Sequence, residues 1–449
     1  MRHTKKILAA VVAVSALTGL AACGNSQQGS SKGDPNKAQI VFWGWDSGNS
    51  MKELVSDFEK ANPGITVKFN NTGTASETQT ALTNAVAAGK GAPDVVMLED
   101  PTVTQFAVTG DLVPLNEFGA DKYAKDFAAG PWNKLQYDSK TYALPIDSGP
   151  EVFFYNQAVF EKAGVDASQI KTWDDYYEAA KKIRAIGSYI TNNSGSSMEY
   201  QPFTAQAWQA GAQPWKVDGE KITIDMTKDS GMKKYIEFQQ KLIDEDLIDT
   251  KIANWSDDWN RSLNDGTLAS LTIGAWMPIN LMNGAPDQAG NWRVAQLPQW
   301  EDGQQVSAED GGSALAVVKQ SKQQAAAYKF AEYLTHGKGA DTMAATGTFP
   351  SLKRLLESKD FTDPQVEANK KVNDFFGGQN VNEVLSQAAQ REVSKFQYLP
   401  YNPFAQTTFG DQISKAYSKE ITLEKAFENY SKALAEHGEQ QGYSVTNKG

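Results

Sequence analysis

The fold is decided by residues 93–101, whose sequence is PDVVMLEDP. An apolar core bounded by a proline and two carboxylates is typical of a short strand buried on both faces. Upstream, residues 39–45 form a similar apolar run, and residues 65–70 alternate as another strand. Residues 51–58 and 76–89 lie between these strands and have helical spacing. Strands that alternate with helices of this length predict βαβ units around a parallel sheet, and therefore an α/β fold.

The predicted strand ends carry aromatic and acidic side chains. In open α/β sheets, ligands bind beyond the carboxyl ends of the strands. We therefore expect one wall of a ligand site here, with Trp43 or Trp45, Asp46, Glu99 and Asp100 as candidates. Asp46 and Asp100 also precede predicted helices, so helix N-capping is the competing interpretation for both.

A second α/β unit is predicted from about Tyr142 onward. Residues 172–175, TWDD, fit a capping box that opens a helix. The remaining predicted elements are a helix over 228–245, strands over 268–273, 292–297 and 313–318, a helix over 321–334, and a mostly helical tail over 351–437 that is interrupted near 398–403.

Composition excludes several classes of function. The chain has 449 residues and a net charge of −11, so nucleic acid and anionic lipid are poor partners. His336 and His437 are the only histidines beyond residue 3, and Cys23 is the only cysteine. A zinc site or a Cys/His nucleophile is therefore not expected. No Gly-x-x-x-x-Gly-Lys-Ser/Thr motif is present, so the sequence shows no nucleotide-binding motif of this type. The length of the chain predicts two domains.

The N-terminus predicts export and anchoring. Basic residues at positions 2, 5 and 6 precede an apolar run over 7–20, which has the length of a signal peptide and is too short for a confident membrane span. The next residues, Leu20-Ala21-Ala22-Cys23, resemble a bacterial lipobox. We therefore expect a signal peptide over 1–22, palmitate-type lipid on Cys23, and a flexible Gly/Ser/Gln-rich tether over 23–37. An ordinary cleaved signal with a chance cysteine is the alternative.

Five segments together resemble a known family. In order along the chain, they are residues 39–64, ending in FEKANPG; residues 92–98 with 110–115; residues 142–145 with 154–156 and 162–164; residues 263–266 with 274–276; and residues 311–317. In this order and at this spacing they resemble the extracellular solute-binding proteins of bacterial carbohydrate ABC importers, the maltose-binding-like group.

The resemblance implies two α/β lobes joined by crossover segments, with a ligand cleft between them. On the family pattern, lobe 1 is 38–147 plus 311–350, and lobe 2 is 148–310 plus 351–449. The implied protein is a non-enzymatic monomer without a cofactor, held by lipid at the extracellular face of the cytoplasmic membrane. It captures an oligosaccharide by hinge closure and delivers it to membrane permease subunits.

A sugar site needs flat aromatic rings for the apolar ring face and planar polar groups for the hydroxyls. Trp276, after the predicted strand 268–273, is the first stacking candidate. The full set of candidate ligand residues is Trp45, Asp46, Glu99, Asp100, Asp147, Trp208, Trp255, Asp257, Trp259, Trp276, Asp310, Gly311 and Phe349. For each tryptophan, packing in the core is the competing interpretation.

Two other classes of protein remain open on sequence. A surface glycoside hydrolase would use two of the listed carboxylates, and an adhesin would lack the cleft. Incubation with oligosaccharides separates them, because only an enzyme forms product and only a binding protein shows a melting shift without product. The many aromatic residues favour di- to tetrasaccharides, no metal site is expected, and a carboxylate-bound Ca²⁺ stays open.

Overall fold

The computed structural model describes residues 32–46, 50–393 and 397–449. The predicted signal peptide, Cys23 and most of the predicted tether lie outside these residues. The last part of the tether, from Lys32, contacts the folded chain: its Nζ lies 2.9 Å from Glu117 Oε2, and its carbonyl accepts a hydrogen bond from Ala325 N. No helix within the described ranges is both long and apolar enough to cross a bilayer.

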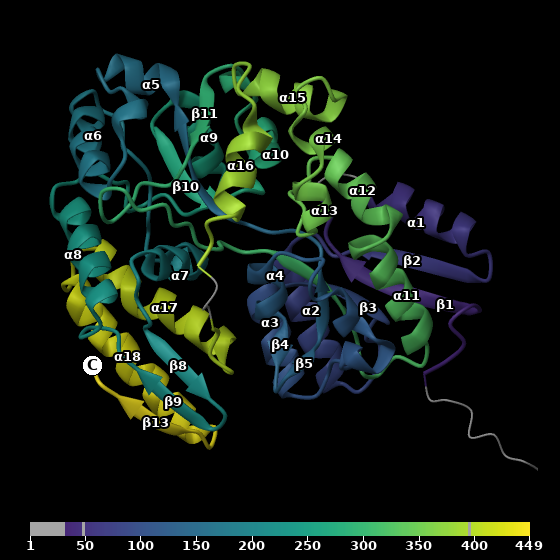
Figure 1. The fold of residues 1–449 in the computed structure, drawn as a ribbon. Coiled ribbons are helices and arrows are strands. Elements are labelled where there is room, and N and C mark those ends of the chain that lie inside the picture. Colours follow the sequence, from purple (N-terminus) through teal and green to yellow (C-terminus); the bar gives the residue numbers. More distant parts are fainter. Residues whose placement is uncertain (1–31, 47–49, 394–396) are drawn as a thin grey trace, which may run out of the picture. The chain divides into compact units, whose positions relative to one another are not determined.

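The first sheet contains the strands that the sequence predicts around residues 93–101. Its order is β2 (Ile65–Asn71), β1 (Ala38–Gly44), β3 (Val95–Glu99), β12 (Ser313–Val317) and β6 (Ala143–Pro145). Figure 1 labels the first three of these strands. β1 pairs in parallel with both β2 and β3, which confirms the predicted βαβ units. β12 is antiparallel to β3 and to β6, so the complete sheet is mixed.

The helices of this unit begin near the predicted positions. α1 (Met51–Ala61) and α2 (Ala75–Ala87) connect the parallel strands, and a capping box between Thr74 and Glu77 fixes the start of α2. α3 (Asp100–Val108) follows β3 directly, with a proline in its first turn. α11 (Gln324–Thr335) packs on the sheet through the aromatic contacts of Phe330 with the core residues.

The second sheet is antiparallel and contains β10 (Ser270–Gly274), β7 (Glu151–Asn156) and β11 (Trp292–Ala295), in that order. The predicted strands over 268–273 and 292–297 are thus confirmed, with slightly different ends. α6 (Trp173–Ala185) begins with the predicted capping box, in which Thr172 Oγ1 accepts from Asp175 N.

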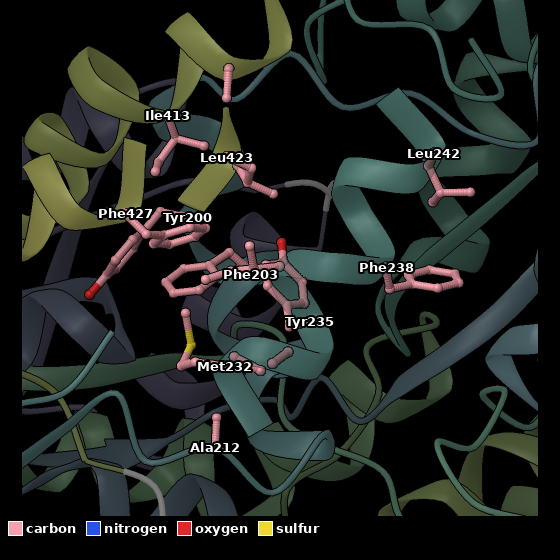
Figure 2. Close-up of a cluster of buried hydrophobic side chains, with 14 of the residues drawn as sticks. Tyr200, Phe203, Ala212, Met232, Tyr235, Phe238, Leu242, Ile413, Leu423 and Phe427 are labelled. Atoms are coloured by element: carbon pink, nitrogen blue, oxygen red, sulfur yellow. The ribbon is translucent and has the colours of Figure 1, made fainter. Parts of the chain in front are cut away.

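A third sheet, β13 (Ser444–Asn447), β9 (Lys221–Ile224) and β8 (Trp215–Asp218), lies beside a helical layer. That layer contains α7 (Tyr200–Gln209), α8 (Ser230–Asp244), α17 (Asn402–Tyr417) and α18 (Leu423–Gln440). Figure 2 shows the aromatic core of these helices. Phe203 packs against Tyr235 and Phe427, with ring centroids 5.5 and 5.1 Å away.

The remaining elements are short. They are η1 (Leu115–Phe118), η2 (Ala120–Tyr123), α4 (Ala129–Lys134), β4 (Gln136–Tyr137), β5 (Lys140–Thr141), α5 (Gln157–Lys162), η3 (Ala167–Gln169), η4 (Ser197–Glu199), α9 (Asp257–Asp265), α10 (Met277–Gly284), η5 (Pro286–Gln288), α12 (Lys338–Ala345), α13 (Lys353–Leu356), α14 (Lys359–Thr362), α15 (Glu367–Phe375) and α16 (Val381–Ala389).

Three crossover segments connect the elements of the first and second sheets and run side by side. They lie at residues 147–150, 309–310 and 349–350. Asp147 pairs with Pro350, and Pro150 pairs with Glu309, as isolated bridges. Asp310 N donates to Gly149 O at 2.7 Å, and Ser148 N donates to Phe349 O at 3.2 Å. The expected lobe boundaries fall on these three segments, and the division into lobes stays a prediction.

Candidate ligand-binding site

The site is built on residues 309–312, the crossover segment that directly precedes β12. Gly311 and Gly312 have φ angles of +88° and +118°, a backbone region that L side chains rarely adopt. A Cβ atom on Gly311 would lie 3.2 Å from both Gln201 Oε1 and Trp276 Nε1. Glycine is therefore required here, because the backbone approaches side chains from α7 and from the end of β10.

Trp276 is fixed to the same crossover segment. Its indole Nε1 donates to the carbonyl of Asp310 at 2.7 Å. The Asp310 carboxylate in turn accepts from Gly274 N at 3.2 Å, at the end of β10. The Trp276 ring is half-buried, so one part packs on the second sheet's core and the rest is accessible.

Trp255 is the most exposed tryptophan among the described residues. It keeps 42 % of its surface exposed and has a φ angle of +69°, which is unusual for a bulky residue. Its ring centroid lies 5.6 Å from that of Trp276 and 4.9 Å from that of Trp259. The three rings therefore form a series from core to surface: Trp259 is buried, Trp276 half-buried and Trp255 exposed.

Four of the predicted carboxylates surround this crossover. Glu99, at the end of β3, accepts from Gln201 Nε2 at 3.2 Å. Asp147 accepts from the hydroxyl of Ser313 at 2.6 Å. Asp100 is fully buried, and neither of its carboxylate oxygens has a hydrogen-bond partner in the described part of the chain. Asp310 contacts Gly274 as described above.

Burial dominates the electrostatics of these acids. It raises the pKa of Glu99 to about 7 and that of Asp310 to about 7. It raises the pKa of Asp147 to about 6, against the opposing hydrogen bonds from Ser313. Burial also raises the pKa of Asp100 well above its usual value, against the attraction of Lys134.

Sequence reasoning missed several polar residues of this region. Glu309 accepts from Gly149 N at 2.8 Å, and Glu392 lies next to Glu309, which together with burial raises the pKa of Glu392. Gln201 reaches Glu99 from α7. Glu309 could have been found as the neighbour of Asp310 on the same crossover. Gln201 and Glu392 carry no signal in the sequence, because only the fold brings them to this place.

Two of the other candidate tryptophans are buried in this structure, and one is half-buried. Trp208 is 5 % exposed and packs edge to face on Trp215, with ring centroids 5.3 Å apart. Trp259 is 1 % exposed, and its Nε1 donates to Asn192 Oδ1 at 3.1 Å. Trp45 is half-buried against the first sheet's core. Packing, the competing interpretation for each tryptophan, accounts for Trp208 and Trp259, whereas Trp45 keeps accessible surface and stays a candidate.

The side chains of three further candidates make other contacts. Asp46 accepts from Ser50 N at 2.9 Å and from Met51 N at 3.2 Å, so its carboxylate pairs backbone N–H groups at the start of α1, where Ser50 is the N-cap residue. Phe349 is buried and packs edge to face on Phe361 at 5.7 Å. Asp257 is exposed in the first turn of α9, where a negative charge favours the helix dipole.

Chemically, the site offers accessible aromatic surface beside many hydrogen-bond acceptors and few charges of opposite sign. This combination suits a neutral, hydroxyl-rich ligand with an apolar face. Within residues 32–46, 50–393 and 397–449, no group of three or more His, Cys, Asp or Glu side chains is arranged to hold a metal ion.

The buried acids predict that stability falls as pH rises from 5 to 8. In the unfolded chain they ionise near their ordinary values, whereas in the folded chain Glu99 holds its proton up to about pH 7. The folded protein is therefore most stable below the pKa that Glu99 has in the unfolded chain. It loses this stability as the pH rises through the higher pKa that Glu99 has in the folded chain. One pKa unit corresponds to about 1.4 kcal/mol, so ionisation of Glu99 alone lowers the free energy of unfolding by on the order of 3 kcal/mol between low and high pH.

Denaturant unfolding at pH 5 and pH 8 measures this effect. Glu99→Gln and Asp100→Asn keep the side-chain size and remove the charge, so each is expected to flatten the pH dependence and to stabilise the protein at pH 8. The exposed Glu237→Gln is the control and leaves the slope unchanged. A wild-type protein that is more stable at pH 8 than at pH 5 would contradict the prediction.

Comparison with known proteins gives the family. The profile of the bacterial extracellular solute-binding proteins matches residues 44–340, which is more than half of the chain. An arabinooligosaccharide-binding protein of Halalkalibacterium halodurans is 27 % identical over 362 residues, covering 77 % of each chain.

Two solved structures extend the likeness to nearly the whole fold. One is an ABC-transporter-associated binding protein of B. animalis subsp. lactis Bl-04 in complex with β-1,6-galactobiose. It is 44 % identical with a TM-score of 0.82, and the match covers 92 % of this chain and 100 % of that one. The other is the galacto-N-biose/lacto-N-biose I-binding protein of Bifidobacterium longum, 26 % identical with a TM-score of 0.78 over the same shares.

These matches confirm the expected periplasmic-binding-protein fold and agree with a site made for binding without catalysis. The chain belongs to the bacterial extracellular solute-binding proteins, a family of non-catalytic binding proteins.

Proposed function

We propose that this protein is the substrate-binding subunit of an ABC sugar importer, and that its ligand is a short galactoside such as β-1,6-galactobiose. The proposal rests mainly on the position of Trp276. Its half-buried ring is fixed by a hydrogen bond to the Asp310 carbonyl, and the hydrogen-bonded pair of Glu99 and Gln201 belongs to the same site. The relative at 44 % identity, solved with β-1,6-galactobiose, supports the choice of sugar.

The side chains at the site match the two surfaces of a sugar ring. The face of Trp276 covers the apolar C–H groups, and about 80 Å² of burial at ~25 cal/mol/Å² contributes about 2 kcal/mol. Carboxylates and the Gln201 amide take the hydroxyls. Asp100 can pair with a hydroxyl that enters the site, because neither of its buried carboxyl oxygens has a hydrogen-bond partner among the described residues.

Capture works by closure. Glu99, Asp100 and Asp147 belong to the first predicted lobe, while Gln201, Trp276 and Asp310 belong to the second. A ligand that contacts both sets stabilises the closed arrangement over the open one. The three adjacent chain segments, joined by antiparallel bridges, are the hinge, and the closed form is the one that the membrane permease receives.

Calorimetric titration tests the ligand. β-1,6-galactobiose is expected to bind, whereas maltose and an arabinobiose serve as comparison sugars and bind more weakly. Small-angle scattering on the same samples is expected to show a smaller radius of gyration with galactobiose. Binding of none of these sugars would overturn the proposed ligand, and an unchanged scattering envelope at saturation would overturn the hinge. Release of galactose from the disaccharide would instead favour a hydrolase.

The membrane anchor is a separate proposal that rests on Cys23, outside the described residues. Cys23→Ser is expected to release the protein from the membrane fraction or to leave it unprocessed. The soluble 24–449 protein, which lacks Cys23, is expected to bind sugar with the affinity of the anchored protein. Stable anchoring requires two or more acyl chains. Mass spectrometry of the wild-type N-terminus checks this, and an unmodified Cys23 would end the anchor proposal.

A further inference from the structure

Two carboxyl side chains meet beside the crossover segments. Glu309, on the crossover before β12, accepts from Gly149 N at 2.8 Å and from Ser148 Oγ at 3.2 Å. Glu392 lies after α16, in a segment that forms a bridge to the same crossover at Ser307. The carboxyl groups of Glu309 and Glu392 are hydrogen-bonded to each other. Such a bond requires that one of the two groups holds a proton.

This carboxyl pair also contacts the first predicted lobe, through Gly130 in α4. A Cβ atom on Gly130 would lie 2.5 Å from Glu392 Oε2 and 3.6 Å from Glu309 Oε2. Glycine at this position therefore leaves the space that the two carboxyl groups occupy. Glu392 and Gly130 belong to different predicted lobes, so the contact spans the hinge. Opening of the lobes would therefore change the surroundings of the pair.

The carboxyl pair lies among other acids. Lys134 on α4 is 5 % exposed and attracts the carboxylates of Glu392 and Asp100. Glu392 Oε1 and both carboxyl oxygens of Asp100 have no hydrogen-bond partner in the described part of the chain. One lysine does not balance three buried acids when all are ionised. The titratable and charged side chains that face the pair are Lys134 of α4, Asp100 of α3, Asp147 and Asp310 of the crossover segments, and Tyr398.

These surroundings favour the protonated form of Glu392. Burial and the neighbouring Glu309 raise the pKa of Glu392 well above its usual range, against the attraction of Lys134. When the lobes separate, water reaches the carboxyl group, and its pKa returns toward the ordinary value. Closure of the lobes around a ligand is therefore expected to take up a proton at neutral pH.

From these contacts we propose that Glu309 and Glu392 are positioning residues, which share one proton across the hinge and so hold residues 309–312 in the sugar-binding arrangement. This inference rests on the proposed function and adds a proton to it. Loss of the proton to solvent leaves two adjacent carboxylates, which repel each other and displace Glu309. The next residue, Asp310, binds Trp276 through its carbonyl, so the displacement reaches the sugar site. Sugar affinity is highest at low pH and falls as the pH rises from the pKa of Glu392 in the open form to that in the closed form.

Calorimetric titration of the full-length protein with β-1,6-galactobiose tests the proton directly. In buffers of different ionisation enthalpy at pH 7, the wild type is expected to take up protons on binding. Glu392→Gln keeps a hydrogen-bond donor to Glu309 and cannot titrate, so it should bind like the wild type at pH 5.5 and take up fewer protons. From pH 5.5 to 8.0 the wild type should lose about tenfold more affinity than this variant, the factor for one unit of pKa difference. Glu237→Gln, exposed on α8, is the control and should match the wild type.

The outcomes separate this inference from the proposed function. If the wild type and Glu392→Gln bind sugar with equal proton uptake and parallel pH profiles, the proposed function stands and the shared proton is overturned. If the wild type binds no galactobiose at any pH, the proposed ligand is wrong, and small-angle scattering without sugar then decides on the pair. The radius of gyration should increase from pH 5.5 to 8.0 in the wild type and stay constant in Glu392→Gln. A wild-type radius that does not change with pH would overturn the pair in that case.

Discussion

Replacement of Trp276 by alanine is expected to weaken sugar binding about 30-fold. The loss corresponds to about 2 kcal/mol, the value of the ring face that would otherwise cover the sugar's C–H groups. Stability should fall only modestly, because the ring is half-buried and its main polar tie is one hydrogen bond to the Asp310 carbonyl. Calorimetry and thermal unfolding on the same variant measure both quantities.

Trp276→Phe is the matched control. It keeps an aromatic face and loses the indole N–H, so most of the affinity should remain while the link to Asp310 is lost. If the alanine variant unfolds much more easily yet binds sugar normally in its folded fraction, Trp276 is a packing residue and does not stack on the ligand.

Replacement of Trp259 by alanine is expected to lower the free energy of unfolding by about 3–5 kcal/mol. The ring is 1 % exposed within the second sheet's core cluster, and its N–H is paired with Asn192. Truncation leaves a cavity and an unpaired amide oxygen. Denaturant unfolding at a pH where the wild type is fully folded gives the value.

Trp259→Phe refills most of the cavity and should recover a large part of this loss. The comparison with Trp276 is informative because both rings contact Trp255 and the same hydrophobic core, yet one is buried and the other only half-buried. A Trp259→Ala protein with near wild-type stability and lost sugar affinity would reverse the roles assigned to the two tryptophans.

The architecture was largely predictable because periodicity and turn residues act locally. The strand predicted over 93–98, the helices predicted over 51–58 and 76–89, and the capping box at Thr172 all follow from short-range patterns. The antiparallel placement of β12 between β3 and β6 did not follow, because strand order depends on where the chain returns from the second unit.

The site was predictable only in part, for a related reason. Glu99, Asp100 and Trp276 follow strands, so the sequence places them at strand ends. Trp208 and Trp259 have similar polar neighbours in sequence but are buried, because helix faces and not neighbours decide exposure. Gln201 reaches Glu99 across 102 positions of the chain, and no local pattern encodes such a contact.

The position of β12 has a consequence for biogenesis. The first sheet has β6, ending at Pro145, as an edge strand that pairs only with β12, which ends at Val317. Until residue 317 has left the ribosome, β3 and β6 cannot be joined, and at about 5–20 residues per second this delay lasts roughly 10–30 s. A nascent chain that cannot complete its first sheet stays loosely folded during this interval. For a member of an extracellular family, such a delay lengthens the time in which the chain is still open for export.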